Sequence, residues 1–262
     1  ALRSVTAPEA VPIAQMVLLF RRAQKMLGTY LNPLVGQERA YTMLHMDAVT
    51  GRINGTNAGK NNPDRGLLNL PKRADIGKPA DLKYRSIFIP DSDELTDSDA
   101  SQIELRVLAY MSGDARMKYV FDNNMDMHAD AEEAIWGTRG VRRDYAKVFN
   151  YAVAYNADTQ AIADGIESTD ILRVAAERQK WMDTYSGAAR WIGSQMIEGP
   201  RDGYVESLMG RKMYLPVERE EKHVLNCFVN WPIQCTAAEA FKLAILECKY
   251  IMDWALLLMH DG

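Results

Sequence analysis

The chain has 262 residues and a formal net charge of −4, with 47% apolar and 25% charged residues, which excludes a disordered, collagenous or disulfide-built protein. Its three cysteines (Cys227, Cys235 and Cys248) form no CxxC pair, so we expect reduced core thiols in a cytosolic compartment and no structural zinc. No signal peptide is visible, the apolar run at 254–259 is too short to span a bilayer, and the acidic balance by itself disfavours a nucleic-acid partner.

The N-terminal half combines helix with irregular segments. Apolar residues at helical spacing predict a helix within 8–35, and a Gly- and Asn-rich stretch over 48–80 is typical of loops or hairpins. Residues 84–90 predict a short strand, after which an acidic run leads to Asp99. The apolar spacing then predicts a helix over 101–112.

The C-terminal half is mostly helical, and a few strands beside many helices indicate the α+β class. The expected elements, in order, are two helical pieces over 114–137, a helix over 139–155, helix over 168–199 that stops at Gly199-Pro200, a hairpin over 203–216, helix over 217–252 broken near Pro232, and a strand-like run over 254–259.

Two aspartates, Asp99 and Asp261, stand at the ends of strand-like segments far apart in the sequence. Carboxylates that converge from two such ends can hold Mg²⁺ together with water and substrate phosphates. Position alone leaves an alternative open, in which Asp99 caps the following helix and Asp261 ends a strand in solvent.

Four residues in the helix over 139–155 recur every four positions: Arg143, Lys147, Tyr151 and Tyr155. Each step turns by about 40° on a helix, so the four share one broad face. Two cations followed by two aromatic rings suit a polyphosphate and a stacked base. An exposed basic face that becomes a core-facing aromatic stripe explains the spacing equally well.

Taken in order, these segments resemble DNA polymerase family A, the DNA polymerase I group. Residues 99–106 (DASQIELR) look like the family's motif A, 143–155 like motif B, and 259–261 (MHD) like the start of motif C. Further similar segments are Thr50-Gly-Arg52, Leu68-Asn-Leu-Pro71, Asp126-Met-His128, Gly203-Tyr-Val-Glu206, Met209-Gly-Arg211 and residues 230–238, while residues 21–30 look like the end of a thumb.

This resemblance implies the right-hand polymerase fold, with an antiparallel-sheet palm, helical fingers and a thumb that is largely absent. It implies the end of the thumb at 1–35, the first part of the palm at 36–112, the fingers at 113–200 and the second part of the palm at 201–262. No segment resembles a proofreading exonuclease.

The resemblance also implies template-directed DNA synthesis, in which two Mg²⁺ ions assist the addition of deoxynucleotides to a primer 3′-hydroxyl. Asp99 and Asp261 would be catalytic and would hold the metals, with help from the Ala100 carbonyl. The implied partners are primer–template DNA and deoxynucleoside triphosphates, without a membrane. DNA contacts are implied for Arg52, Asn69, Arg211, Asn230, Gln234 and His260, and nucleotide contacts for Gln102, Glu104, His128, Arg143, Lys147, Tyr151 and Tyr155.

Individual roles follow from the same resemblance. Arg143, Lys147 and His128 would supply positive charge to the phosphates. Glu104 would close the pocket against a ribose 2′-hydroxyl and thereby select deoxynucleotides. A phenol at Tyr151, as in phage-type members, goes with easy acceptance of dideoxynucleotides.

The chain departs from the family pattern at a few positions. Asn156 and Cys235 stand where glycine is usual, and Asn226 stands where a basic residue is usual. Asparagine tolerates left-handed backbone dihedrals, so the turn at Asn156 is expected to survive. Motif C normally continues with an acidic residue, and here Gly262 follows Asp261.

The sequence leaves two other functions open. One is an inactive polymerase-like fragment or protein that only binds primer–template DNA. The other is a single-subunit RNA polymerase, which Glu104 disfavours because a carboxylate there would exclude ribonucleotides. The net charge does not decide against DNA, because the cations gather in the matched motifs, at Arg52, Arg142, Arg143, Lys147 and Arg211.

Overall fold

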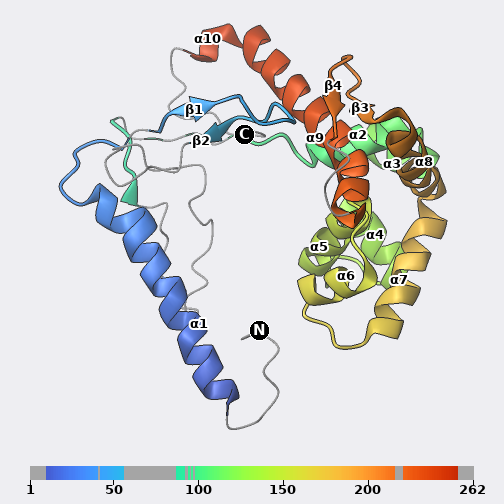
Figure 1. Cartoon of the computed structure of the whole chain (residues 1–262), viewed down its shortest axis with the longest axis horizontal. Coiled ribbons are helices and arrows are strands. Elements are labelled where there is room, and N and C mark those ends of the chain that lie inside the picture. Colours follow the sequence, from blue (N-terminus) through green and yellow to red (C-terminus); the bar gives the residue numbers. More distant parts are fainter. Residues whose placement is uncertain are drawn as a thin grey trace.

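The structure is a computed structural model that describes residues 10–40, 42–55, 87–91, 94, 96, 98–215 and 221–252 (Figure 1). Asn69, His260 and Asp261, and the strand expected at 254–259, lie outside the described residues. The helices are α1 (Val11–Lys25), α2 (Ile103–Ser112), α3 (Ala115–Asp122), α4 (Met127–Trp136), α5 (Arg143–Ala154), α6 (Thr159–Gly165), α7 (Ile171–Thr184), α8 (Ser186–Asp202), α9 (Glu221–Glu247) and α10 (Lys249–Met252), and α1 continues as a π-helical turn η2 (Met26–Leu31) and a 3-10 turn η3 (Asn32–Leu34).

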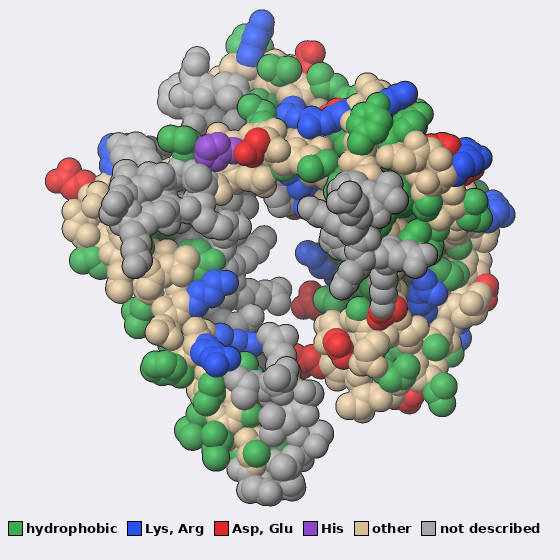
Figure 2. All heavy atoms as spheres, viewed as in Figure 1, with side chains coloured by type: hydrophobic (Ala, Val, Ile, Leu, Met, Phe, Trp, Pro, Cys, Tyr) green, Lys and Arg blue, Asp and Glu red, His purple; other side chains and the backbone are tan. Residues whose placement is uncertain are grey.

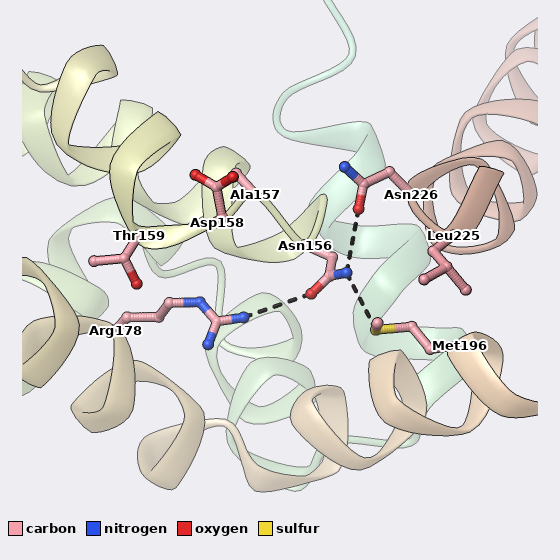
Figure 3. A pocket seen from close by; sticks show the side chains of 8 residues that line it. All are labelled: Asn156, Ala157, Asp158, Thr159, Arg178, Met196, Leu225 and Asn226. Atoms are coloured by element: carbon pink, nitrogen blue, oxygen red, sulfur yellow. Dashed lines mark hydrogen bonds between the residues drawn. The ribbon is translucent and has the colours of Figure 1, made fainter. Parts of the chain in front are cut away.

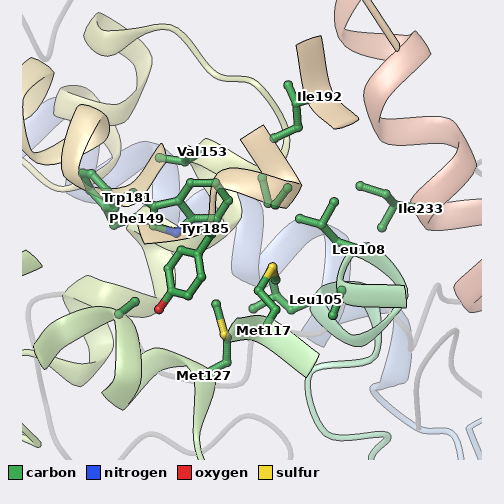
Figure 4. Close-up of a cluster of buried hydrophobic side chains, with 14 of the residues drawn as sticks. Leu105, Leu108, Met117, Met127, Phe149, Val153, Trp181, Tyr185, Ile192 and Ile233 are labelled. Carbon is green, nitrogen blue, oxygen red and sulfur yellow. The ribbon is translucent and has the colours of Figure 1, made fainter. Parts of the chain in front are cut away.

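Helices α2 to α9 share one hydrophobic core (Figure 4). The apolar faces of these helices are buried against one another, and this burial is the main force that holds the body together. Its large side chains that are no more than 2% exposed include Leu105, Leu108, Met117, Met127, Phe149, Val153, Trp181, Tyr185, Ile192 and Ile233.

Several of these helices have an aspartate at the N-cap position. Asp126, Asp158 and Asp170 cap α4, α6 and α7 by accepting hydrogen bonds from amides of the first turn. Asp114 serves two helices, because one carboxylate oxygen accepts from Met117 N at 2.9 Å in α3 and the other from Gly187 N at 2.8 Å in α8. This buried carboxylate therefore fixes the position of α8 relative to α3.

The strands described form two short antiparallel pairs, which confirms the α+β class. They are β1 (Leu44–His45) with β2 (Asn54–Gly55), and β3 (Tyr204–Glu206) with β4 (Lys212–Tyr214). In the second pair Val205 lies opposite Met213, and both pack with Cys227, Phe228 and Cys235 of α9 in a smaller core. Cys248 is exposed, so the expectation of a core thiol is wrong there.

Polar contacts attach the hairpins to α9. The Ser207 hydroxyl donates to Glu239 Oε2 at 2.6 Å, and the Lys242 ammonium donates to the Gly51 carbonyl at 3.1 Å. Gly51 has φ +68°, and a Cβ there would lie 2.7 Å from Arg211 Nη1. Glycine is favoured at this turn because its dihedral is strained for other residues, whereas the flexible end of the Arg211 side chain could move away from a Cβ.

The sequence predicts a helix end at Pro200 and a helix break near Pro232, and both predictions are wrong. Helix α8 continues through Gly199-Pro200 to Asp202, and α9 continues through Pro232 to Glu247. Proline removes one intrahelical hydrogen bond and favours a break. Here burial of Phe228 and Ile233 on either side of Pro232 holds α9 as one helix against the core.

Two further differences concern shorter segments. Residues 87–90, the described part of the strand expected at 84–90, contain no strand, and Ile87 and Ile89 are exposed. Helix α6 was not anticipated, although Asp158 followed by Thr159 is an N-cap signal that could have predicted it.

Helix α1 stands apart from the body formed by helices α2 to α9 (Figure 1). The space-filling view shows an opening between α1 and that body, with Lys and Arg side chains on both of its sides (Figure 2). Among the described residues, no helix is long and apolar enough to cross a membrane.

Candidate active site

Helix α5 presents the face expected from the four-residue spacing. Its inner side buries Ala146, Phe149, Asn150 and Val153, which drives the helix against the core. Arg143 and Lys147 are exposed, whereas Tyr151 and Tyr155 are half-buried and pack against the core. The ligand-binding interpretation fits the two cations, because they are exposed. The interpretation as a core-facing aromatic stripe fits the two tyrosines, because their rings pack against the core.

The C-terminal end of α5 contacts two other matched segments through one carboxylate. The Tyr155 hydroxyl donates a hydrogen bond to Glu104 of α2, and the Arg52 guanidinium forms an ion pair with the same carboxylate. The Glu104 side chain is only 15% exposed, which strengthens these charged contacts. Arg52, Glu104 and Tyr155, far apart in the sequence, thus form one contact network.

Asp99 lies just before α2, in a segment without regular secondary structure. The N-cap of α2 is Gln102, so the alternative in which Asp99 caps the helix is wrong. The Asp99 carboxylate is exposed, and no described residue bonds to it. The Asp99 carboxylate and the carbonyl of the next residue, Ala100, are hard oxygen donors of the kind that Mg²⁺ prefers, and this carbonyl accepts a hydrogen bond from Ile103 N at 3.3 Å. The expected partner Asp261 lies outside the described residues.

Gln102 and Asn230 each carry a buried polar atom without a partner. Gln102 Oε1 and Asn230 Oδ1 accept no hydrogen bond from the part of the chain that the structure describes. Gln102 also adopts φ +55°, a strained value for a residue other than glycine. Unpartnered acceptors and local strain of this kind are typical of positions that contact a ligand.

Arg143 is held at the start of α5 by the residue that caps α4. Its Nε and Nη2 atoms donate to Asp126 Oδ2 at 2.7 and 2.6 Å. Burial raises the pKa of Asp126, but the hydrogen bonds from Arg143 and from the amides of His128 and Ala129 outweigh it and lower the pKa overall. Asp126 is therefore ionised at neutral pH and orients the Arg143 guanidinium.

His128 is buried among partners that determine its tautomer. Trp181 Nε1 can only donate, and it donates to Asn150 Oδ1 at 2.8 Å, so the amide nitrogen of Asn150 faces His128 Nδ1 at 3.1 Å. That nitrogen can only donate, so Nδ1 accepts and the ring proton lies on Nε2.

The His128 ring is also neutral. Burial, together with the cations Arg143 and Lys147, lowers its pKa to about 4 despite the opposing charge of Asp126. In this arrangement His128 can donate a hydrogen bond from Nε2 but does not add the positive charge expected of it. The cationic part of the face consists of Arg143 and Lys147.

The remaining predicted DNA contacts lie on α9 and the β3–β4 hairpin. Asn230 and Gln234 are four residues apart on α9, so their half-buried side chains share one face. Arg211 is exposed and approaches the backbone of Gly51, next to Arg52. The structure thus brings Arg52, Arg211 and α9 together.

A cavity of about 300 Å³ lies beyond the C-terminal end of α5 (Figure 3). Asn156 has φ +55°, which confirms the left-handed turn expected there. Its side chain donates to Asn226 Oδ1 at 3.2 Å and accepts from Arg178 Nη2 at 3.5 Å. Two of the departures from the family pattern, Asn156 and Asn226, are therefore bonded to each other, and Arg178, which no sequence motif indicated, completes the contact.

The sequence of this chain is similar to those of known DNA polymerases. A sequence model described as DNA polymerase family A matches residues 1–261. DNA polymerase I from Deinococcus radiodurans is 32% identical over 276 residues, which cover 97% of this chain and 27% of that protein. The thermostable DNA polymerase I of Thermus thermophilus is 31% identical over 256 residues, which cover 91% of this chain and 29% of that protein.

The fold is also similar to a solved structure, described as the POL domain of Pol1 from M. smegmatis in complex with DNA primer-template and dNTP. The TM-score is 0.76 at 23% identity, and the match covers 95% of this chain and 46% of that one. The chain belongs to DNA polymerase family A. It spans less than a third of the length of the two curated relatives named above.

Proposed function

We propose that this chain carries the polymerising site of a template-directed DNA polymerase, which adds deoxynucleotides to a primer 3′-hydroxyl. The observation that supports this most directly is the contact of Glu104 with Tyr155 and Arg52, which joins three motif segments beside the cationic face of α5. In this proposal residues 1–35 end a thumb, 36–112 and 201–262 form the palm, and 113–200 form the fingers.

The incoming triphosphate would lie along α5. Arg143 and Lys147 would neutralise its phosphates, and His128 would donate from Nε2 to a phosphate oxygen. Tyr151 would stack beside the sugar and base, and Tyr155 would lie near the templating position. Glu104, held by two partners, would present a fixed carboxylate that leaves no room for a 2′-hydroxyl.

Asp99, the Ala100 carbonyl and Asp261 would hold two Mg²⁺ ions. When bound, the metals would supply Lewis-acid activation of the 3′-hydroxyl and neutralise charge on the leaving pyrophosphate. Arg52, Asn69, Arg211, Asn230, Gln234 and His260 would contact the primer–template, with the polar side chains in the minor groove, where acceptors common to all base pairs allow geometry to be checked.

Primer extension tests this proposal. The chain is mixed with a primer–template and Mg²⁺ and offered either deoxynucleotides or ribonucleotides. We expect extension by deoxynucleotides and little by ribonucleotides. Extension by ribonucleotides alone would remove the role given to Glu104, and salt-sensitive DNA binding without extension would favour the alternative in which the chain only binds primer–template.

Tyr151 carries a second prediction. Its phenol lies 5.7 Å from the His128 ring and 6.2 Å from the Tyr155 ring, measured between centroids. We expect the chain to accept dideoxynucleotides readily and Tyr151→Phe to increase discrimination against them, because the hydroxyl beside the sugar is removed. Competition between deoxy- and dideoxynucleotides in primer extension measures this. Strong discrimination by the unaltered chain that Tyr151→Phe does not increase would contradict it.

A further inference from the structure

A buried carboxylate, Glu132, lies directly behind the start of α5. Glu132 is on α4, one turn after His128, so the two side chains share the face that meets α5. The residue is fully buried, and none of the ion pairs described involves its carboxylate. A fully buried carboxylate is normally neutralised by a cation or saturated with hydrogen bonds.

Glu132 is saturated by the loop that precedes α5. Its Oε1 atom accepts from the Thr138 hydroxyl and from the amides of Val141 and Arg142, and its Oε2 atom accepts from the amide of Gly140, each at 2.9 Å. Three successive amides that converge on one anion form the kind of concave site that binds phosphate in other proteins. Here the occupant is a side chain of the same chain.

This contact substitutes for a missing helix cap. Arg142, the N-cap of α5, makes no capping hydrogen bond with its own side chain. Glu132 instead places negative charge at the N-terminal end of α5, which the helix dipole favours. Burial raises the pKa of Glu132, but the four donated hydrogen bonds outweigh it and lower the pKa, so the carboxylate is ionised at neutral pH.

Helix α4 thus holds Arg143 from two sides. Asp126 binds its guanidinium, and Glu132 binds the amide of the residue before it. We propose that Glu132 is a positioning residue, whose carboxylate sets the loop 138–142 and thereby places Arg143 where the triphosphate binds. This inference rests on the proposed function, and it assigns to Glu132 a role in triphosphate affinity and none in DNA affinity.

Glu132→Gln tests the inference, because the variant keeps the size of the side chain but turns an NH₂ group toward the amides. Glu133→Gln is the matched control, since Glu133 is the next residue on α4, is exposed and pairs only with Arg139 in the described contacts. Three quantities are measured well below the unfolding temperature of each variant: amide hydrogen exchange at residues 140–142, affinity for dTTP with Mg²⁺, and affinity for primer–template DNA.

We expect Glu132→Gln to lose protection at these amides and to bind dTTP about tenfold more weakly, with unchanged DNA affinity, while Glu133→Gln behaves like the unaltered chain. Glu132→Asp, which keeps the charge but reaches less far, should be intermediate. Unchanged exchange, or lost protection with unchanged dTTP affinity in the folded variant, would overturn the inference. If the unaltered chain itself does not bind dTTP, the proposed function fails first, which distinguishes the two failures.

Discussion

Replacing Asp99 with alanine is expected to slow primer extension by at least about a thousandfold while leaving the affinity for primer–template DNA nearly unchanged. The carboxylate is exposed, and no described residue bonds to it, so its removal should not disturb the fold. Its expected contribution is to hold metal at the reacting atoms, which is worth several kcal/mol in the transition state. Single-turnover extension and a DNA-binding titration measure the two effects separately.

Asp91→Ala is a suitable control for this variant. Asp91 is also an exposed carboxylate in the acidic run, but it forms an ion pair with Arg39 at 2.8 Å. Exposed ion pairs contribute little to stability, so this variant should extend primers at the original rate. Persistent extension by Asp99→Ala would show that Asp99 is not a metal ligand.

The second large effect concerns stability and the contact between α8 and α9. Gly199 is buried, and a Cβ at this position would lie 2.4 Å from Phe228 Cδ1 and 2.5 Å from Cγ. The Phe228 ring is buried and rigid and cannot move aside, so α8 and α9 would have to move apart. We expect Gly199→Ala to lower the free energy of unfolding by about 1–3 kcal/mol, measured by urea denaturation.

Gly193 provides the matched control on the same helix. A Cβ there meets no atom within 4 Å, so the substitution adds helix propensity without a clash. Gly193→Ala should therefore raise the free energy of unfolding by up to about 1 kcal/mol. If Gly199→Ala is as well tolerated as Gly193→Ala, the close packing of α8 on Phe228 is not a feature of the protein in solution.

Much of the site could be predicted from short-range sequence patterns. The four-residue spacing from Arg143 to Tyr155 predicted one helix face, because helical periodicity depends only on neighbouring residues. Asn156 was expected in a left-handed turn for the same local reason, and its φ of +55° agrees. The hairpin over 203–216 was predicted from the two short segments that begin at Gly203 and Met209, and β3 and β4 pair there.

The features that could not be predicted depend on tertiary contacts. Glu132 looks like an ordinary helical carboxylate until the loop 138–142 folds around it. The neutral state of His128 comes from burial and from Asn150, a residue 22 positions away. The continuity of α9 through Pro232 likewise depends on burial against the core, which outweighs the local tendency of proline to end a helix.

The positions of the cations also revise the inference that an acidic net charge disfavours a nucleic-acid partner. A net charge of −4 describes the whole chain, whereas a polyanion meets only the local surface. Arg143 and Lys147 are exposed on one face of α5, and Arg52 and Arg211 approach the same turn at Gly51. Local cations on an acidic protein are therefore compatible with DNA as a partner.

Template-directed addition of a single nucleotide tests the central claim most directly. Each of the four deoxynucleoside triphosphates is offered alone, with Mg²⁺, to primer–templates that differ only in the first unpaired template base. We expect one addition for each template, by the complementary nucleotide, and none with Asp99→Ala. Addition that ignores the template base, or no addition of any nucleotide while DNA is bound, would contradict the assignment of a DNA-polymerising site to this chain.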